Sequence, residues 1–216
     1  MLFVKKSIGW FFFGAALIVL IPIGILLKLK WYISGGGPQR PSQDSVDAYE
    51  DVTQAMQDAD LNALEAFTRS VEGFPLGNDP FVNTPWLNHA FDYGNHLAVI
   101  TWLIEQGCDV NFEDDCGNWP LDNACEQQPF NAEVAQALID AGADIDHGDC
   151  LGFTSLHHVA MRGHLDALKW LLSKGADTTK AQWDYHGSDP LAIDMARKYS
   201  QKEAYAILER AMASSN

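Results

Sequence analysis

One apolar position recurs about every 35 residues, and this repeat constrains the fold more than any other feature of the sequence. Similar segments follow Leu87, Leu121, Leu156 and Ile193, which are spaced 34, 35 and 37 residues apart. Periods of roughly 20–50 residues are typical of proteins built from stacked supersecondary units. Since the apolar face of one unit is too large to be buried alone, we expect the units to stack on one another.

The copy at residues 149–179, DCLGFTSLHHVAMRGHLDALKWLLSKGADTT, predicts a pair of short helices. Thr154 is suited to cap a helix over residues 155–162, and Gly163 is suited to end it in a left-handed conformation. A second helix follows, whose apolar stripe consists of Leu165, Leu168, Leu171 and Leu172. The sequence therefore predicts a helix-turn-helix unit with an extended arm after it.

These residues resemble the ankyrin repeat, whose pattern is D-x-x-G-x-T-P-L-H-x-A-A-x-x-G-H, an apolar helix and G-A-D. The matching positions are Asp149, Gly152, Thr154, Leu156, His157, Ala160, Gly163, His164, Gly175, Ala176 and Asp177, with Ser155 and Val159 as departures. The preceding copy matches at Asp114, Gly117, Pro120, Leu121, Ala124, Gly142, Ala143 and Asp144. The resemblance implies an all-α solenoid of helix-turn-helix units with short β-hairpin arms, covering about four to five units in residues 45–211.

Two copies depart from the regular length or pattern. The segment EQQPFN, residues 126–131, has a two-residue excess that should enlarge the turn between the helices of its unit. Residues 52–67 resemble a degenerate N-terminal pair of helices. Residues 212–216 are expected to form a tail.

Residues 8–27, IGWFFFGAALIVLIPIGILL, contain no charged side chain. A helix of this length spans about 30 Å, the thickness of the hydrocarbon core of a bilayer. A cleaved signal peptide is the alternative, but Lys28 and Lys30 follow the apolar run where a small-residue cleavage site would be expected. The sequence predicts an N-terminal transmembrane anchor in residues 1–30 and a Gly/Pro/Ser-rich linker in residues 31–44.

Lysines flank both ends of this apolar run, so the predicted orientation in the membrane depends on a small difference in positive charge between the two sides. Lys5, Lys6 and the α-amine precede the run, whereas Lys28 and Lys30 follow it. The positive-inside rule then favours a short cytoplasmic N-terminus and a periplasmic remainder of the chain. A cytosol-facing domain stays open as the alternative.

Charge is distributed unevenly along the chain. No Lys or Arg lies between Arg69 and Arg162, whereas fifteen Asp and Glu residues do. A surface made from this acidic segment would repel phosphate, which argues against nucleic acid as a partner. It favours a protein partner with a basic surface, although an acidic face that serves solubility alone is the other interpretation.

The histidines of the best-preserved copy do not form a metal-binding pattern. Adjacent residues on a helix, such as His157 and His158, point about 100° apart, whereas helical metal ligands are spaced three or four residues apart. The resemblance implies structural hydrogen bonds for His157 and His164, and leaves His158 without a role in the fold. The chain also lacks a C-x-x-C pair, a nucleophile elbow and a phosphate-binding loop. We therefore expect no metal, no cofactor and no enzymatic activity.

The resemblance implies a protein-binding surface made of arm tips and first-helix residues. The matching positions in this chain are Asp92, Tyr93, Asp115, Asn118, Glu126, Gln127, Leu151, Phe153, Met161 and Arg162. We add His158, which the fold leaves without a role, and Trp183, which lies in a long last linker that could also contact a partner. An anchor, a linker and an acidic repeat domain together resemble small bacterial envelope proteins, some of which are immunity proteins that block a secreted toxin. The alternatives are a scaffold or accessory protein for an envelope enzyme, for instance in oxidative stress, and a cytosol-facing adaptor.

Overall fold

The computed structural model describes residues 43–79, 84–112, 117, 119–149, 151–181 and 190–214. Their helices are α3 Gln43–Gln57, α4 Leu61–Phe67, α5 Trp86–Asp92, α6 Leu97–Glu105, α7 Pro120–Glu126, α8 Ala132–Asp140, α9 Ser155–Arg162, α10 Leu165–Ser173, α11 Ala192–Lys198 and α12 Lys202–Ser214. The predicted transmembrane segment, residues 8–27, lies outside the described residues. Among the helices that are described, none has the length and apolarity needed to cross a membrane.

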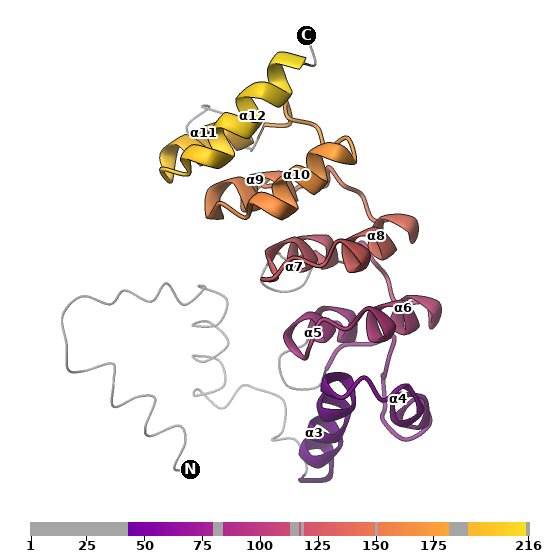
Figure 1. Ribbon diagram of the computed structural model, residues 1–216. Helices are drawn as coiled ribbons and strands as arrows, with labels where there is room; N and C mark the ends of the chain where they lie inside the picture. The colour runs from indigo at the N-terminus through magenta and orange to yellow at the C-terminus, as the bar shows by residue number, and fades with distance from the viewer. Residues whose placement is uncertain are drawn as a thin grey trace, which may run out of the picture. The chain divides into compact units, whose positions relative to one another are not determined.

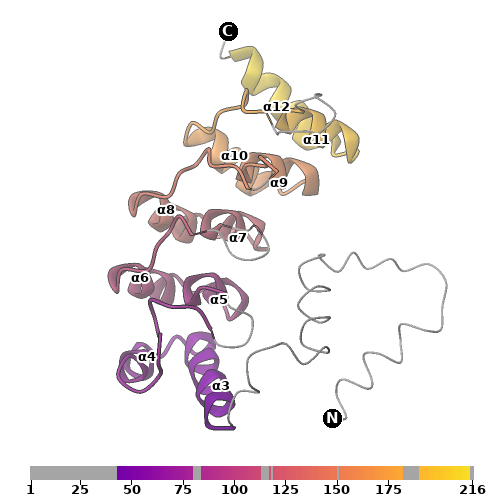
Figure 2. The ribbon, with the colours of Figure 1, turned by 180° about the vertical axis from the view of Figure 1, so that it is seen from behind.

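The helices form successive pairs that stack in two layers (Figure 1). In the first pair, α3 and α4 are steeply inclined to each other, unlike the helices of the later pairs. The first helices of the pairs, α3, α5, α7, α9 and α11, contact one another in that order. The second helices lie on the other side of the stack, as the view from behind also shows (Figure 2). We call these the first-helix layer and the second-helix layer. The described part of the chain is thus the predicted all-α stack of helical pairs.

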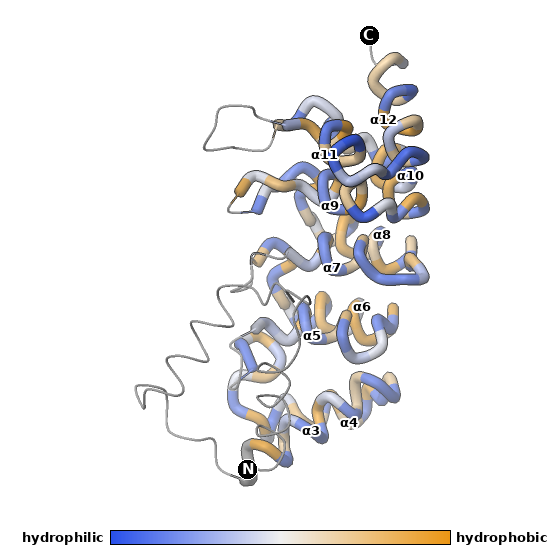
Figure 3. Tube along the Cα trace, turned by 90° about the vertical axis from the view of Figure 1, so that its left-hand side faces the viewer, coloured by the Kyte–Doolittle hydropathy of each residue, from blue (hydrophilic) through white to orange (hydrophobic). Residues whose placement is uncertain are grey.

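The core runs between the two layers and is made from the repeated apolar positions. Leu87, Leu121 and Leu156 are each about 1% exposed and occupy the same place in successive first helices. Hydrophobic and hydrophilic positions alternate along the labelled helices (Figure 3), as expected of helices that pack through one face. Full burial of one leucine stabilises the fold by about 1.5–3 kcal/mol, so these layers hold the units together.

Helix α9 begins and ends where the sequence predicts. Thr154 is its N-cap, and Gly163 follows it with φ of 74°. The backbone N–H of Thr154 donates to Nδ1 of His157 at 3.2 Å, and Nε2–H of His157 donates to the carbonyl of Pro190 in the next unit at 3.3 Å. Burial lowers the pKa of His157, consistent with a neutral ring that accepts at one nitrogen and donates at the other. The structural role implied for His157 is confirmed.

His164 differs from this expectation. Its buried Nδ1 has no hydrogen-bond partner among the described residues. The structural hydrogen bond implied for His164 is therefore not found at this nitrogen.

The arms between the helical pairs contain less β-structure in the described residues than a β-hairpin with a continuous ladder would have. There the arms are joined only by isolated antiparallel bridges, Asn78 with Pro85 and Ala181 with Leu191. Pro85 has no backbone N–H, so a ladder of hydrogen bonds cannot continue through it. In the described residues the predicted β-hairpin arms are thus represented by single antiparallel bridges.

Several boundaries differ slightly from the predicted ranges. Helix α3 starts at Gln43, two residues before the expected domain start at 45, and α12 continues to Ser214, three residues beyond 211. The extension of α12 follows from good helix formers in AMAS at its end. The turn enlarged by EQQPFN is confirmed, since residues 127–131 separate α7 from α8, whereas Gly163 and His164 alone separate α9 from α10.

Gly163→Ala should lower the free energy of unfolding by about 2 kcal/mol, and Gly175→Ala by about 1 kcal/mol. Both glycines have positive φ, 74° and 89°, which strains any L-residue with a side chain. A Cβ at Gly163 would also collide with the amide of Gln201, which donates to the carbonyl of Met161, whereas nothing lies within 4 Å of a Cβ at Gly175. Urea unfolding of both variants measures the difference; equal losses would show that Gln201 moves aside without cost.

Candidate functional site

Four charged side chains from two successive units meet in the first-helix layer. Glu126 is the last residue of α7, His158 and Arg162 lie on α9, and Asp149 precedes α9. Nδ1 of His158 is 3.6 Å from Oε1 of Glu126, and its Nε2 is 3.5 Å from Oδ2 of Asp149. Arg162 forms an ion pair with the other oxygen of Glu126. Because helical residues four apart share a face, His158 and Arg162 reach the same carboxylate. We call these four residues the acidic network.

The charges in the acidic network favour a protonated His158. Burial acts to lower the pKa of His158, but the contact with Asp149 and the charges of Asp122, Glu126 and Asp149 outweigh it, and the pKa is raised. Burial acts to raise the pKa of Asp149, but His158 and two backbone N–H donors lower it overall. The expectation that the fold leaves His158 without a role is wrong, since His158 links two units through their carboxylates.

Two apolar side chains flank the acidic network. Oδ1 of Asp149 accepts the backbone N–H of Leu151 at 2.8 Å and that of Phe153 at 2.9 Å, which fixes the arm before α9. The side chain of Leu151 is 43% exposed. The half-buried ring of Phe153 lies 5.6 Å from the ring of His158. An exposed leucine thus stands beside a charged cluster on the first-helix layer.

The structure brings together only some of the residues predicted to bind a partner. Glu126, Phe153, His158 and Arg162 meet at the network, and Leu151 is tied to it through Asp149. Met161 is half-buried next to them. Asp115, Asn118 and Trp183 lie outside the described residues.

The other predicted residues gather near the turns between first and second helices. Asp92 is exposed at the end of α5, and Gln127 is half-buried after α7; both line a cleft of about 580 Å³ between these turns. Tyr93 is half-buried, with its hydroxyl 3.0 Å from that of Tyr49 in α3. Tyr93 therefore connects the first unit to the N-terminal pair.

The comparisons with known proteins agree with this stack of helical pairs. The family model "Ankyrin repeats (3 copies)" matches residues 87–182. Residues 87–182 contain ankyrin repeats. It is 37% identical over 83 residues to "Ankyrin repeat protein OPG189" of Variola virus, a match that covers 38% of this chain and 15% of the relative.

Two further relatives match longer parts of the chain. "Putative E3 ubiquitin-protein ligase XBAT34" of Arabidopsis thaliana is 30% identical over 126 residues, which cover 56% of this chain and 30% of the relative. "NF-kappa-B inhibitor alpha" of Sus scrofa is 30% identical over 145 residues, 59% of this chain and 44% of the relative. The chain spans less than half the length of each of these relatives. The match therefore concerns the ankyrin repeats as a protein-protein interaction module.

The ankyrin repeats also bury a polar network that the sequence did not reveal. Asp122 accepts a hydrogen bond from Ser155 Oγ at 2.6 Å and one from His147 Nε2 at 3.1 Å. Nδ1 of His147 donates to the carbonyl of Asp144 at 2.8 Å. Both ring nitrogens lie next to acceptors, which favours the cationic form of His147. Burial acts to lower its pKa, but Asp122 and Asp144 outweigh it, and the pKa is raised.

This buried network differs from a catalytic triad in the order of its members. In a triad the histidine lies between the serine and the aspartate, whereas here Asp122 lies between Ser155 and His147. The arrangement gives Ser155 no base and instead joins two ankyrin repeats. The signal available in the sequence was that Asp122 follows Leu121 and Ser155 precedes Leu156, which are equivalent positions in successive repeats. Within the described ranges, no group of three or more His, Cys, Asp or Glu side chains is placed to hold a metal ion.

Proposed function

We propose that the ankyrin repeats of this chain bind a protein partner with a basic surface through the first-helix layer, centred on Leu151. The exposed Leu151 beside the acidic network is the observation that carries this proposal. Protein interfaces commonly place an apolar anchor at the centre of a charged rim. Within the network, Arg162 and His158 pair with Glu126 and Asp149. The wider segment of residues 70–161 has fifteen Asp and Glu residues and neither Lys nor Arg, which favours a partner of opposite charge.

The finer proposal is that the chain is tethered to a membrane by residues 8–27 and inhibits its partner, as an immunity protein does a secreted toxin. Three observations support it: the charge-free apolar run at residues 8–27, the acidic surface and the relative named as an inhibitor of NF-kappa-B. A phosphatase or a fluorescent protein fused to the C-terminus tests the topology. Phosphatase activity supports an extracytoplasmic domain, and fluorescence alone supports a cytosol-facing adaptor.

Affinity capture from membranes with the full-length chain at low salt, followed by mass spectrometry, tests the proposed binding. We expect a basic protein to be recovered, and Leu151→Ala to weaken its binding about tenfold, the effect of losing about 1.4 kcal/mol at an interface. Leu76→Ala is the matched control, because Leu76 is also an exposed leucine, 66% exposed, in the loop after α4. Recovery of no partner, or equal weakening by both substitutions, would contradict the proposal. Inhibition of the captured protein's activity would separate an inhibitor from a scaffold.

A further inference from the structure

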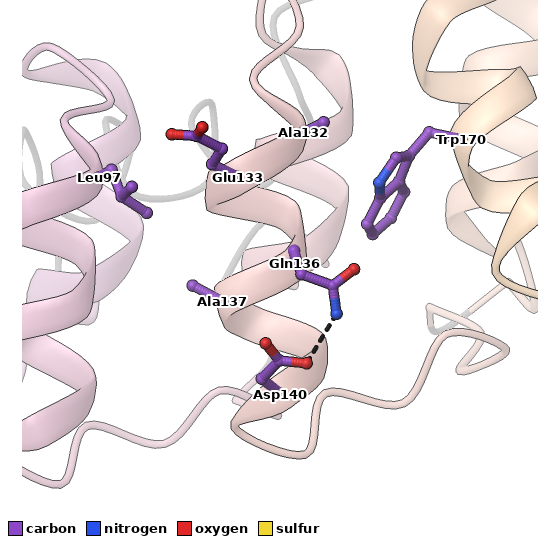
Figure 4. A pocket seen from close by; sticks show the side chains of 7 residues that line it. All are labelled: Leu97, Ala132, Glu133, Gln136, Ala137, Asp140 and Trp170. Atoms are coloured by element: carbon purple, nitrogen blue, oxygen red, sulfur yellow. Dashed lines mark hydrogen bonds between the residues drawn. The ribbon is translucent and has the colours of Figure 1, made fainter.

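Helix α8 forms the floor of a shallow cleft on the second-helix layer (Figure 4). The cleft has a volume of about 580 Å³. Leu97 of α6 and Trp170 of α10 lie on opposite sides of α8, and Ala132 and Ala137 lie on α8 itself. Because these two alanines are short, the surface of α8 lies low between the larger side chains of its neighbours.

The cleft continues past the beginning of α8. The second cleft, between the turns after α5 and α7, is also lined by Ala132 and Glu133, so the two clefts meet there. The enlarged turn contributes Phe130, whose ring packs edge-on against Trp170 with centroids 5.7 Å apart. We call this continuous surface, from Asp92 through Glu133 to Asp140, the α8 strip. It is long enough for a short segment of a partner, since α8 alone is about 14 Å long.

Negative charge lies along the α8 strip. Asp92, Glu133 and Asp140 are exposed along it. Its floor between Leu97 and Trp170 consists of two alanines and Gln136, whose side-chain N–H donates to Oδ1 of Asp140 at 2.7 Å. Lys174 lies beside the strip, and its ammonium lies over the ring of Trp170, 5.6 Å from the centroid. Residues 70–161, which include all of α8, contain no Lys or Arg, so a basic occupant meets no like charge from α8 itself. An occupant needs an apolar face for the floor and basic side chains for the edges.

We propose that the α8 strip is a second docking surface, which binds a basic amphipathic helix of a partner protein. Such a helix places apolar residues three and four positions apart on the floor and Lys or Arg against Glu133 and Asp140. This surface is separate from the one proposed around Leu151, because α8 belongs to the second-helix layer. The chain would then hold two partner elements, or two partners, on opposite layers of the stack.

The test uses the full-length chain and a labelled synthetic helical peptide with leucine on one face and lysine on the other, followed by fluorescence anisotropy. Glu133→Lys combined with Asp140→Lys should raise the Kd at least about tenfold, because two attractive charges become repulsive at the contact. Glu65→Lys combined with Glu72→Lys is the matched control, since both residues are exposed, lie away from the strip and change the net charge equally. The control pair should change the Kd by less than about threefold.

A second variant fills the α8 strip without changing its charge. Ala137→Trp should raise the Kd at least about tenfold, with the helical content checked by circular dichroism. The proposal fails if the peptide does not bind, if the two charge-reversed pairs weaken binding equally, if Ala137→Trp binds as well as the original chain, or if a scrambled peptide of the same composition binds as tightly. Leu151→Ala should leave peptide binding unchanged, so this proposal and the proposed function can fail independently.

Discussion

Leu156→Ala is expected to lower the free energy of unfolding by about 3 kcal/mol, whereas Leu151→Ala should change it by less than about 0.5 kcal/mol. The two leucines belong to the same ankyrin repeat, but Leu156 is 1% exposed and Leu151 is 43% exposed. Truncation of Leu156 removes buried apolar surface and leaves a cavity between stacked first helices. Truncation of Leu151 removes surface that water already contacts.

The effect of Leu156→Ala should extend beyond its own unit. Helix α9 contacts both α7 and α11, and repeat stacks derive their stability from such nearest-neighbour interfaces. Urea unfolding followed by far-UV circular dichroism measures the loss, and hydrogen exchange should show weaker protection in α11 and α12 as well as in α9. Equal losses for the two leucine variants would contradict the assignment of Leu156 to the core.

The local signals in the sequence predict the helices well. Thr154 and Gly163 determine both ends of α9 through interactions within a few residues, and such interactions are visible in a sequence pattern. The degenerate pair at residues 52–67 also forms helices, with Asp60 accepting the backbone N–H groups of Asn62 and Ala63 at the start of α4. The arms were harder to predict, because a β-ladder needs partners across a loop and Pro85 prevents one.

The candidate site was only partly predictable, since its contacts connect different ankyrin repeats. Glu126 and His158 stand nearly one repeat apart, and this spacing was the available signal that stacking would bring them together. The sequence assigns His158 to a partner because the repeat pattern gives this position no structural role. The role of His147 is not visible in the sequence, because its partner Asp122 is 25 residues away at the beginning of α7.

The second large loss of stability is expected when the pair of His147 and Asp122 is broken. His147→Leu should lower the free energy of unfolding by about 3 kcal/mol near pH 6, because it leaves the carboxylate of Asp122 buried without its cationic partner. Asp122 keeps the hydroxyl of Ser155 and the backbone N–H of Trp119 as donors, which limits the loss. His96→Gln is the control, since His96 is exposed and should change stability by less than about 0.5 kcal/mol.

The stabilisation from His147 should depend on pH in a defined direction. Its pKa in the folded chain is raised above the ordinary value of 6.5, so its contribution is fully present below about pH 6.5 and is lost as the pH rises through the folded pKa. His157 has the opposite sign, because burial lowers its pKa and its contribution is lost as the pH falls through the lower folded value. Both the original chain and His147→Leu contain His157 and His158, so subtracting their unfolding free energies isolates His147. That difference, measured by urea unfolding at several values between about pH 5.5 and 9, should shrink as the pH rises; a difference that stays constant would show that folding does not shift the pKa of His147.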